Sequence, residues 1–476
     1  MTHIHELSAE RQLAAVRRRE LSPGEITSHY LDRISRLDNH VGAFITVTAE
    51  LAERQAQKAE ERLVSDTPAE LPPLLGLPLP VKDLDMVAGV RCTSGSSACA
   101  EQFASTDSAF VAELRHAGAV FLGKTNTPEF GLSCYTENDI APAARTPWDL
   151  TRSAGGSSGG AAAAVAAGLA PVAQGSDGGG SIRIPASVCG LVGLKPTRGR
   201  VTAAPDGFDL LGLAVAGPIA RTVADAALVL DTMAGNRPGD YYVPPPLPAG
   251  ETFRSYAARE PGQLRVARFC RTHVPGVELH PDVVAAYDDA TGALTALGHH
   301  VEEITLPFDP SLAERFTVVW AAMAATAPVP EQGEDLLRPL TRWLRERATR
   351  TSAADYVHAA MGVQQAVRSA MSVLQDYDAV LTPTLAAPPV PVGYFTAGGD
   401  VAEEFQRMMA FTPFTAMYNL TGQPAVSLPL YWNAAGLPIG VMLACRPNDE
   451  ATLLSLSAQL EAARPWSGRI PPLWSV

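Results

Sequence analysis

Lysine is rare in this sequence, and one lysine stands where chemistry could use it. Of the 37 basic residues only four are lysines, and the rest are arginines. Arginine stays protonated in proteins, whereas a desolvated lysine can lose its proton and act as a base. Lys82 lies in an apolar run with Leu77, Leu79 and Val81. One interpretation is a general base, and the other is a solvated lysine at a strand end that pairs with Asp83.

A glycine-rich segment, GGSSGG (155–160), carries the first candidate serine. Ser157 comes just before an Ala-rich run (159–169) that is expected to be helical. The free N–H groups at a helix start create a positive potential that can favour a reactive serine. A flexible linker is the plainer interpretation of this segment.

A run of three glycines precedes the second candidate serine. Gly178, Gly179 and Gly180 lead directly into Ser181, and the stretch IRIP follows. The N–H groups of such a run can converge on one oxyanion, because no side chain blocks the approach. An ordinary tight turn is the plainer interpretation of the same residues.

Two further segments match known sequence motifs, but their flanking residues do not predict the secondary structure that these motifs require. The segment 118–125 fits the phosphate-binding pattern GxxxxGK[ST], which needs a strand before it and a helix opening at its lysine. Here a helix is expected before Gly118, and Asn-Thr-Pro follows at 126–128. The segment 155–159 fits GxSxG, the nucleophile motif of α/β-hydrolases, which needs a hydrophobic strand directly upstream and a histidine further on. The upstream TPWDLTRSA is polar. Nucleotide binding is disfavoured, and an α/β-hydrolase remains an alternative.

The composition is that of a large folded protein. The 476 residues are 46% hydrophobic and 18% charged, with a net charge of −13 and no basic run of five or more residues. Nucleic acid and acidic membranes are therefore disfavoured as partners. The apolar stretch 161–173 is too short to span a bilayer, and the N-terminus has no apolar signal region. The six cysteines show no zinc-like spacing, so we expect no metal and no cofactor, and a cytoplasmic location.

Strands and helices alternate along the chain, which predicts an α/β fold with a large mixed sheet covered by helices on both faces. The expected helices are two within 8–35, then 50–64, 108–119, 159–169, 220–235, 281–298, several in 311–375, 405–422 and 449–463. The expected strands are 43–47, 79–84, 119–125, 191–197, 265–270, 299–306, 378–384, 425–432 and 440–445.

Taken together, these segments resemble the amidase signature family. The most diagnostic stretch is AGGSSGGAAAAVAAGLAPVAQGSDGGGSIRIPASVCGLVGLKPTRGR (154–200). Support comes from LGLPLPVKDL (75–84), GKTNTPEFG (123–131), LTPT (381–384) and TGQPAVSLPL (421–430). The resemblance runs from about residue 70 to the C-terminus and is weakest between 300 and 400.

The resemblance implies a Ser–Ser–Lys mechanism. Lys82 corresponds to the family's catalytic lysine, Ser157 to its bridging serine and Ser181 to its nucleophile. Neutral Lys82 then accepts a proton from Ser157, which takes the proton of Ser181 as that serine attacks the amide carbon. Gly178, Gly179 and Gly180 are expected to hold the oxyanion, and water hydrolyses the acyl-enzyme. In the family a cis peptide bond precedes the bridging serine, so we expect one at Gly156–Ser157.

The resemblance also bears on the substrate. NRPGD (236–240) and PASVCGLVGLKPTRGR resemble the branch with 6-aminohexanoate cyclic-dimer hydrolase and other broad amidases. The expected pocket stretches, 130–137, 315–330 and 405–419, are apolar. They offer Trp320, Met323, Phe411, Phe414 and Met417, for which core packing is the plainer interpretation.

These features favour an apolar aliphatic or aryl amide as a small-molecule substrate, with esters or carbamates as further possibilities. A glutaminase of the glutaminyl-tRNA amidotransferase type is the alternative within the family.

Three positions depart from the family pattern. Residue 178 is glycine where many relatives carry a bulkier residue, and Pro142 and Thr146 replace a usual glycine and asparagine. We expect one domain over 1–476, in a monomer or homodimer. Its parts are N-terminal helices to about 65, a signature core at about 70–235, a variable pocket region at about 305–415, and C-terminal strands and a helix at about 416–476.

Overall fold

The computed structural model describes residues 3–205, 207, 209–307, 309 and 311–475, and two sheets organise them. The larger sheet has eight strands in the order β4-β6-β5-β10-β11-β9-β7-β8, and the smaller has three in the order β1-β3-β2. Pairs from β4 to β9 are antiparallel, whereas β9, β7 and β8 run parallel. The expected α/β fold with a large mixed sheet is confirmed.

The strands are β1 (Phe44–Val47), β2 (Val81–Lys82), β3 (Gly123–Thr125), β4 (Val172–Asp177), β5 (Val192–Lys195), β6 (Val215–Ala220), β7 (Arg265–Arg268), β8 (His300–Glu303), β9 (Ala379–Pro383), β10 (Ala425–Trp432) and β11 (Pro438–Cys445). The helices are α1 (Ala9–Arg17), α2 (Pro23–Val41), α3 (Ala49–Ser65), α4 (Ala109–His116), α5 (Gly159–Ala166), α6 (Arg183–Cys189), α7 (Val223–Met233), α8 (Phe253–Ala257), α9 (Pro281–Ala296), α10 (Leu312–Ala325), α11 (Pro339–Thr349), α12 (Ala353–Leu374), α13 (Val401–Phe411), α14 (Ala416–Thr421) and α15 (Glu450–Ala463).

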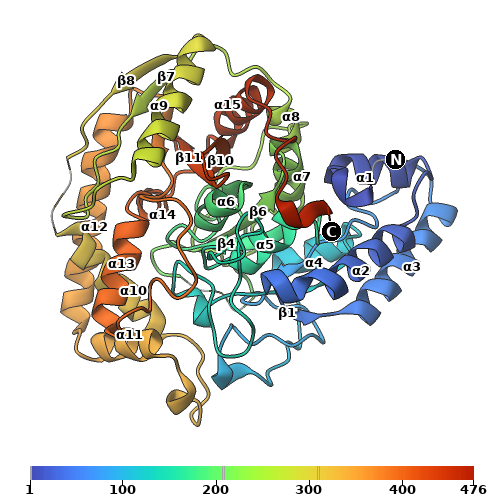
Figure 1. Cartoon of the computed structure of the whole chain (residues 1–476), viewed down its shortest axis with the longest axis horizontal. Helices are drawn as coiled ribbons and strands as arrows, with labels where there is room; N and C mark the ends of the chain where they lie inside the picture. The colour runs from blue at the N-terminus through green and yellow to red at the C-terminus, as the bar shows by residue number, and fades with distance from the viewer. Residues whose placement is uncertain (1–2, 206, 208, 308, 310, 476) are drawn as a thin grey trace.

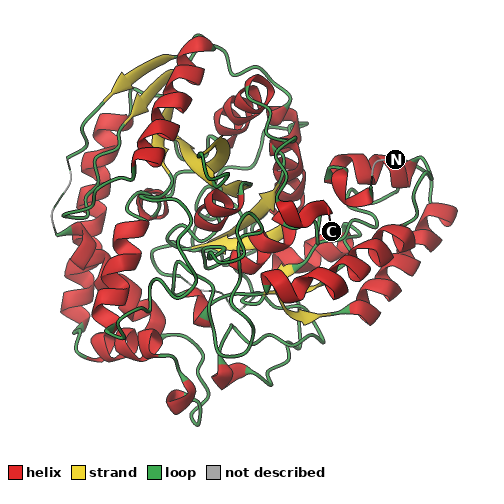
Figure 2. Ribbon diagram, viewed as in Figure 1, coloured by secondary structure: helices red, strands yellow, loops and turns green. Residues whose placement is uncertain are grey.

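Helices cover both faces of the larger sheet, as Figure 2 shows. Alternate strand residues divide between two cores: Val172 and Ala220 pack with α7, α9 and α15, and Ala173 and Ile219 pack with α5 and α6. In Figure 1 the helices α10 to α13 stand on one side of this centre and α1 to α3 on the other. The strand ends and loops between them carry the candidate residues.

Two strands of the larger sheet were not expected from the sequence. β4 contains Gln174 and Asp177, whose polar side chains are buried and hydrogen-bonded rather than packed in an apolar core. β6 contains Gly217 and Pro218, both poor strand formers. The apolar pattern therefore misses both strands, although they pair along their whole length.

The single helix expected over 405–422 is wrong, because the chain breaks between α13 and α14. Pro413 falls in the middle of this stretch, where it cannot donate a helical hydrogen bond and disfavours a helical Thr412. Thr412 has ψ 46° and ends α13. The break matters because it turns the chain beside the glycine-rich loop.

The phosphate-loop pattern at 118–125 forms a strand rather than a loop and helix. Its lysine, Lys124, lies on β3 and makes a buried ion pair with Asp83 at 3.0 Å. A side chain on Gly123 would overlap the carbonyl oxygen of Thr46 on β1. This segment is therefore part of the smaller sheet, which holds β2 and its Lys82 in place.

Close contact between α6 and the sheet generates a test of stability. A Cβ atom on Gly193 of β5 would lie 2.5 Å from Ala186 Cβ and 2.8 Å from the Ile182 carbonyl oxygen. We expect Gly193→Ala to lower the free energy of unfolding by about 1–3 kcal/mol, because α6 has to move away. Urea-induced unfolding measures this change.

The matched control is Gly292→Ala in α9, where a Cβ atom meets nothing within 4 Å. It is expected to raise stability by up to about 1 kcal/mol, because alanine is the better helix former. Equal effects of the two substitutions would contradict the proposed tight packing of α6.

Candidate active site

Lys82 is brought against two serines at the end of the short strand β2. Its side chain is fully buried, and Nζ lies 2.7 Å from Ser157 Oγ and 3.1 Å from Ser176 Oγ. The Lys82 backbone N–H donates to Gln174 Oε1 at 2.8 Å, which ties β2 to β4. The neighbouring Asp83 pairs instead with Lys124. The interpretation of Lys82 as a solvated partner of Asp83 is therefore wrong.

The surroundings of Lys82 favour its neutral form. Burial lowers the pKa of Lys82 to about 7, although the nearby carboxylates of Asp85 and Asp177 act in the opposite direction. The desolvated ammonium is costly, while a neutral amine is not. The neutral form of Lys82 is therefore accessible at neutral pH and can accept a proton from a hydroxyl.

Ser157 and Ser158 link the glycine-rich segment to the rest of the site. The Gly156–Ser157 peptide bond is cis, as expected from the family resemblance. Ser158 N–H donates to the Ser181 carbonyl oxygen at 3.1 Å, and Ser158 Oγ donates to the Ser176 carbonyl oxygen at 3.1 Å. These bonds place the segment that carries Ser157 beside the segment that carries Ser181.

Lys82 is hydrogen-bonded to Ser157 directly, whereas the Ser181 hydroxyl is hydrogen-bonded to neither of them in the described part of the chain. Among the described residues no hydrogen bond links the Ser157 and Ser181 hydroxyls. A proton relay through both serines requires contact within hydrogen-bond distance, which catalytic groups often reach only when substrate is bound.

The glycine loop presents fewer free N–H groups than expected. The Gly180 N–H donates to Asp177 Oδ1 at 2.8 Å, so it is not available to an oxyanion. The expectation that Gly178, Gly179 and Gly180 all point at one oxyanion is thus not met at Gly180. The N–H groups of Gly178, Gly179 and Ser181 make no hydrogen bond within the described part of the chain.

The loop around Ser181 is built on the buried carboxylate of Asp177. Besides the Gly180 N–H, Asp177 accepts hydrogen bonds from Arg183 Nε at 2.9 Å and Asn419 Nδ2 at 2.9 Å. Arg183 also donates to the Thr415 carbonyl oxygen at 2.8 Å. Burial alone raises the pKa of a carboxyl, but the Arg183 guanidinium holds the pKa of Asp177 well below its usual range.

Sequence reasoning missed this network. Asp177 lies within the glycine-rich run that the sequence singled out. Its partner Asn419 and the Arg183 partner Thr415, however, come from the far end of the chain. Gly180 is required here for two reasons, because its φ is +135° and a Cβ atom would overlap Thr415 Oγ1. The network therefore fixes the backbone that precedes Ser181.

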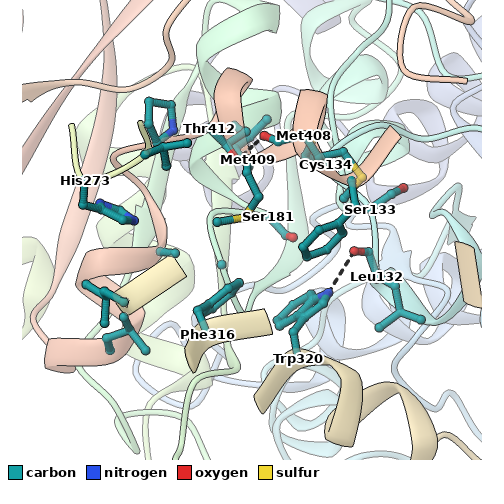
Figure 3. Close-up of a pocket in the computed structure, with 18 residues that line it drawn as sticks. Leu132, Ser133, Cys134, Ser181, His273, Phe316, Trp320, Met408, Met409 and Thr412 are labelled. Atoms are coloured by element: carbon teal, nitrogen blue, oxygen red, sulfur yellow. Dashed lines mark hydrogen bonds between the residues drawn. The ribbon is translucent and has the colours of Figure 1, made fainter. Parts of the chain in front are cut away.

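An apolar pocket opens at Ser181, as Figure 3 shows. All three expected stretches contribute to its lining, which includes Leu132, Ser133, Cys134, Phe316, Trp320, Phe405, Met408, Met409 and Thr412. Ile184, Leu312 and His273 line it as well and were not foreseen. Burial raises the pKa of the Cys134 thiol and lowers the pKa of His273 to about 4, so neither is charged at pH 7.

Four of the five named pocket candidates lie elsewhere. Only Trp320 lines the Ser181 pocket, whereas Met323 lines a separate cavity with Leu84 and Ser176. Phe411, Phe414 and Met417 are buried in the cores, so the plainer interpretation holds for them.

The described residues contain neither a metal-binding cluster nor a membrane-spanning helix. Within the described ranges no group of three or more His, Cys, Asp or Glu side chains lies close enough together to hold a metal ion. No helix in those ranges is long and apolar enough to cross a bilayer.

Comparison with known proteins places this fold and site in a family. A sequence profile of the Amidase family matches residues 25–454. The 6-aminohexanoate-cyclic-dimer hydrolase of Paenarthrobacter ureafaciens is 35% identical over an alignment of 491 residues that covers 98% of this chain and 96% of that protein. The acylamidase of Rhodococcus erythropolis is 34% identical over an alignment of 478 residues that covers 98% of each chain.

Solved structures agree with this placement. A structure of 6-aminohexanoate cyclic dimer hydrolase superposes with a TM-score of 0.91 at 33% identity, covering 99% of this chain and 100% of the other. The chain belongs to the amidase signature family and is an enzyme of the amidase class of hydrolases.

The Asp177–Arg183 pair generates a second test of stability. We expect Asp177→Asn to lower the free energy of unfolding by about 3–5 kcal/mol, because it leaves the buried Arg183 charge without its partner. Urea-induced unfolding of the purified variant measures this loss. The matched control is Asp149→Asn, which removes a half-exposed pair with Arg152 at 2.9 Å. There the expected loss is about 0–1 kcal/mol, and a similarly small loss at Asp177 would contradict the assigned role.

Proposed function

We propose that this protein hydrolyses uncharged amides through an acyl-enzyme on Ser181, with Ser157 and Lys82 as its proton relay. The observation that carries this proposal is the buried Lys82 Nζ, 2.7 Å from Ser157 Oγ, with a pKa lowered to about 7 by burial. A neutral amine in contact with a hydroxyl is the arrangement that a serine relay needs at neutral pH.

The reaction proceeds in two halves. Ser157 passes its proton to Lys82 and receives the proton of Ser181, whose oxygen bonds to the amide carbon. The negative charge that develops on the carbonyl oxygen is stabilised by the free N–H groups of Gly178, Gly179 and Ser181. The proton then returns through Ser157 to the leaving nitrogen, the C–N bond breaks, and water cleaves the acyl-Ser181 ester by the same relay.

The lining of the Ser181 pocket supports an apolar aliphatic or aryl substrate. None of the described lining side chains carries a charge at pH 7, so a charged acyl group would be desolvated without a partner. Activated esters and carbamates present the same carbonyl to Ser181 and fall within the proposal. The acylamidase and cyclic-dimer hydrolase relatives fit this class of substrate.

Two alternatives are disfavoured by specific observations. A glutaminase of the glutaminyl-tRNA amidotransferase type would bind the charged α-amino and carboxylate groups of glutamine, for which the described lining of this pocket has no charged partner. An α/β-hydrolase would use Ser157 as its nucleophile with a histidine base, but the partner of Ser157 is Lys82. Moreover, turns and isolated β-bridges rather than a hydrophobic strand precede Ser157 over the described residues 146–156.

The nucleophile assignment is tested by Ser181→Ala. We expect the variant to lose more than about a thousandfold in kcat, because the acyl-enzyme cannot form. A fluorophosphonate should label the wild-type protein at Ser181, as read by mass spectrometry of the peptides. The control is Ser187→Ala on α6, whose hydroxyl bonds the Gly440 N–H and should leave labelling unchanged. Labelling of Ser157 instead would reverse the two serine roles.

The base assignment is tested by Lys82→Arg. We expect it to be nearly as inactive as Lys82→Ala, since a guanidinium stays protonated and cannot accept a proton. In the wild type the active form is the neutral lysine, so kcat/KM should fall about tenfold per pH unit below pH 7 and level off above it. Retention of more than about a tenth of the activity in Lys82→Arg, under 1.4 kcal/mol of barrier, would refute the neutral-lysine mechanism.

Lys195 provides the control for this pH profile. Burial also lowers the pKa of Lys195 to about 7, but its Nζ bonds the Pro196 carbonyl oxygen rather than a serine. Lys195→Met should keep the midpoint of the kcat/KM profile near pH 7. Loss of that midpoint in the variant would show that the titrating group is Lys195 and not Lys82.

A further inference from the structure

We propose that Trp320 and Gly178 together determine which acyl groups this enzyme accepts. The indole of Trp320 occupies the space next to residue 178 and forms the wall of the Ser181 pocket on that side. The inference rests on the proposed function and deepens it, because it names the residues that limit the size of the acyl group.

The size of the side chain that fits at position 178 is limited by the Trp320 indole and not by the backbone conformation of the loop. A Cβ atom on Gly178 would lie 3.4 Å from Cη2 and 3.5 Å from Cζ3 of Trp320, and 3.8 Å from Ala214 Cβ. Its φ is not in the left-handed region, whereas Gly180 has φ +135°. A Cβ atom is therefore just accommodated at Gly178, and a branched side chain would press on the indole.

The indole is held in place from two sides. Trp320 Nε1 donates to the Leu132 carbonyl oxygen at 3.2 Å, drawn as the dashed line between these two residues in Figure 3. Its ring stacks on Phe316, with centroids 5.5 Å apart and planes at 20°. Leu312, Phe316 and Trp320 are spaced by four residues on α10, so they share one helix face and form a continuous wall.

The opposite wall of the pocket is softer. It is formed by α13, which contributes Met408 and Met409. Methionine side chains have several rotatable bonds and adapt to different shapes. The rigid indole therefore limits the size of the acyl group that fits, and the methionines adapt to the shape of the groups that do.

The position of Ser157 indicates which part of the substrate meets Trp320. Ser157 returns the proton to the leaving nitrogen, so the leaving group lies on its side of Ser181. The Trp320 pocket contains Ser181 and Gly179 but, among its described lining, neither Ser157 nor Lys82. The pocket therefore takes the acyl group.

The leaving group faces a different set of residues on the other side. Leu84 and Ser157 Oγ both border Gly131, and Leu84 also lines the separate cavity that contains Ser176 and Met323. Met323 follows Trp320 by one helical turn on α10. One helix thus contributes Trp320 to the acyl side and Met323 to the leaving-group side.

The test varies the acyl chain while the leaving group stays constant. Acyl p-nitroanilides from acetyl to decanoyl are assayed with the wild type, Gly178→Val, Trp320→Ala and the double variant. We expect Gly178→Val to lower kcat/KM for long chains about tenfold or more relative to acetyl, because the valine displaces the indole into the pocket. Trp320→Ala should shift the preference toward longer chains, and the double variant should recover the long-chain activity that Gly178→Val loses.

Met323→Ala is the matched control from the same helix. It should leave the dependence on acyl length unchanged, because Met323 lines the other cavity. Equal losses at all chain lengths in Gly178→Val, or no recovery in the double variant, would overturn the inference.

Labelling of Ser181 separates this inference from the proposed function. Each variant is treated with a small ethyl fluorophosphonate, which reports an intact nucleophile without filling the pocket. A labelled variant with an unchanged chain-length profile overturns only the role of Trp320 and Gly178. A wild-type protein that neither labels at Ser181 nor cleaves any anilide overturns the proposed function and the inference together. Variants that fail to label are repeated as Gly178→Ala and Trp320→Phe, for which smaller shifts in the same directions are expected.

Discussion

The desolvation of one ammonium group is the constraint on which the rest of the site depends. Lys82 is fully buried at the end of a two-residue strand, and its amine reaches two serine hydroxyls. A lysine in such a place is costly while it is charged, so burial converts a poor base at neutral pH into an effective one. Asp83 would cancel this effect if it paired with Lys82, but the neighbouring Lys124 binds it instead. Lys124, which is also buried, therefore helps to keep Lys82 neutral by pairing with Asp83.

A second buried charge pair has a different task. Asp177 and Arg183 neutralise one another, and their hydrogen bonds reach the Gly180 N–H and the chain at Thr415 and Asn419. The loop before Ser181 is thereby fixed by the far end of the sequence and by α6, which lies against the sheet. A rigid loop suits the stabilisation of developing charge, because its N–H groups need not reorganise during the reaction. The pocket beyond it is apolar, so charge is confined to the loop and the relay.

Much of the fold could be predicted from the sequence, because its signals were local: the apolar strands β10 and β11 follow from patterns of residues close in the chain. The pairing of Lys82 with Ser157, 75 residues apart, was expected only from the family resemblance, because nothing local links the two segments. The strand β4 could not be predicted, since its buried Gln174 and Asp177 find their partners only in three dimensions. Nor could the sequence predict that the Gly180 N–H donates to Asp177 and is thereby unavailable to an oxyanion. Phe411, Phe414 and Met417 were expected in the pocket, but they are buried in the cores, where an apolar side chain gives the same signal in the sequence.

The central claim is that Lys82 is neutral at physiological pH, and its titration tests this most directly. With only four lysines in the chain, a protein labelled with [ε-13C]lysine gives few signals, and the one lost in Lys82→Arg belongs to Lys82. The account predicts that this signal titrates with a midpoint near pH 7, in line with the pKa lowered by burial. A midpoint near the ordinary lysine value of about 10.4 would contradict it, because the relay would then have no base at neutral pH.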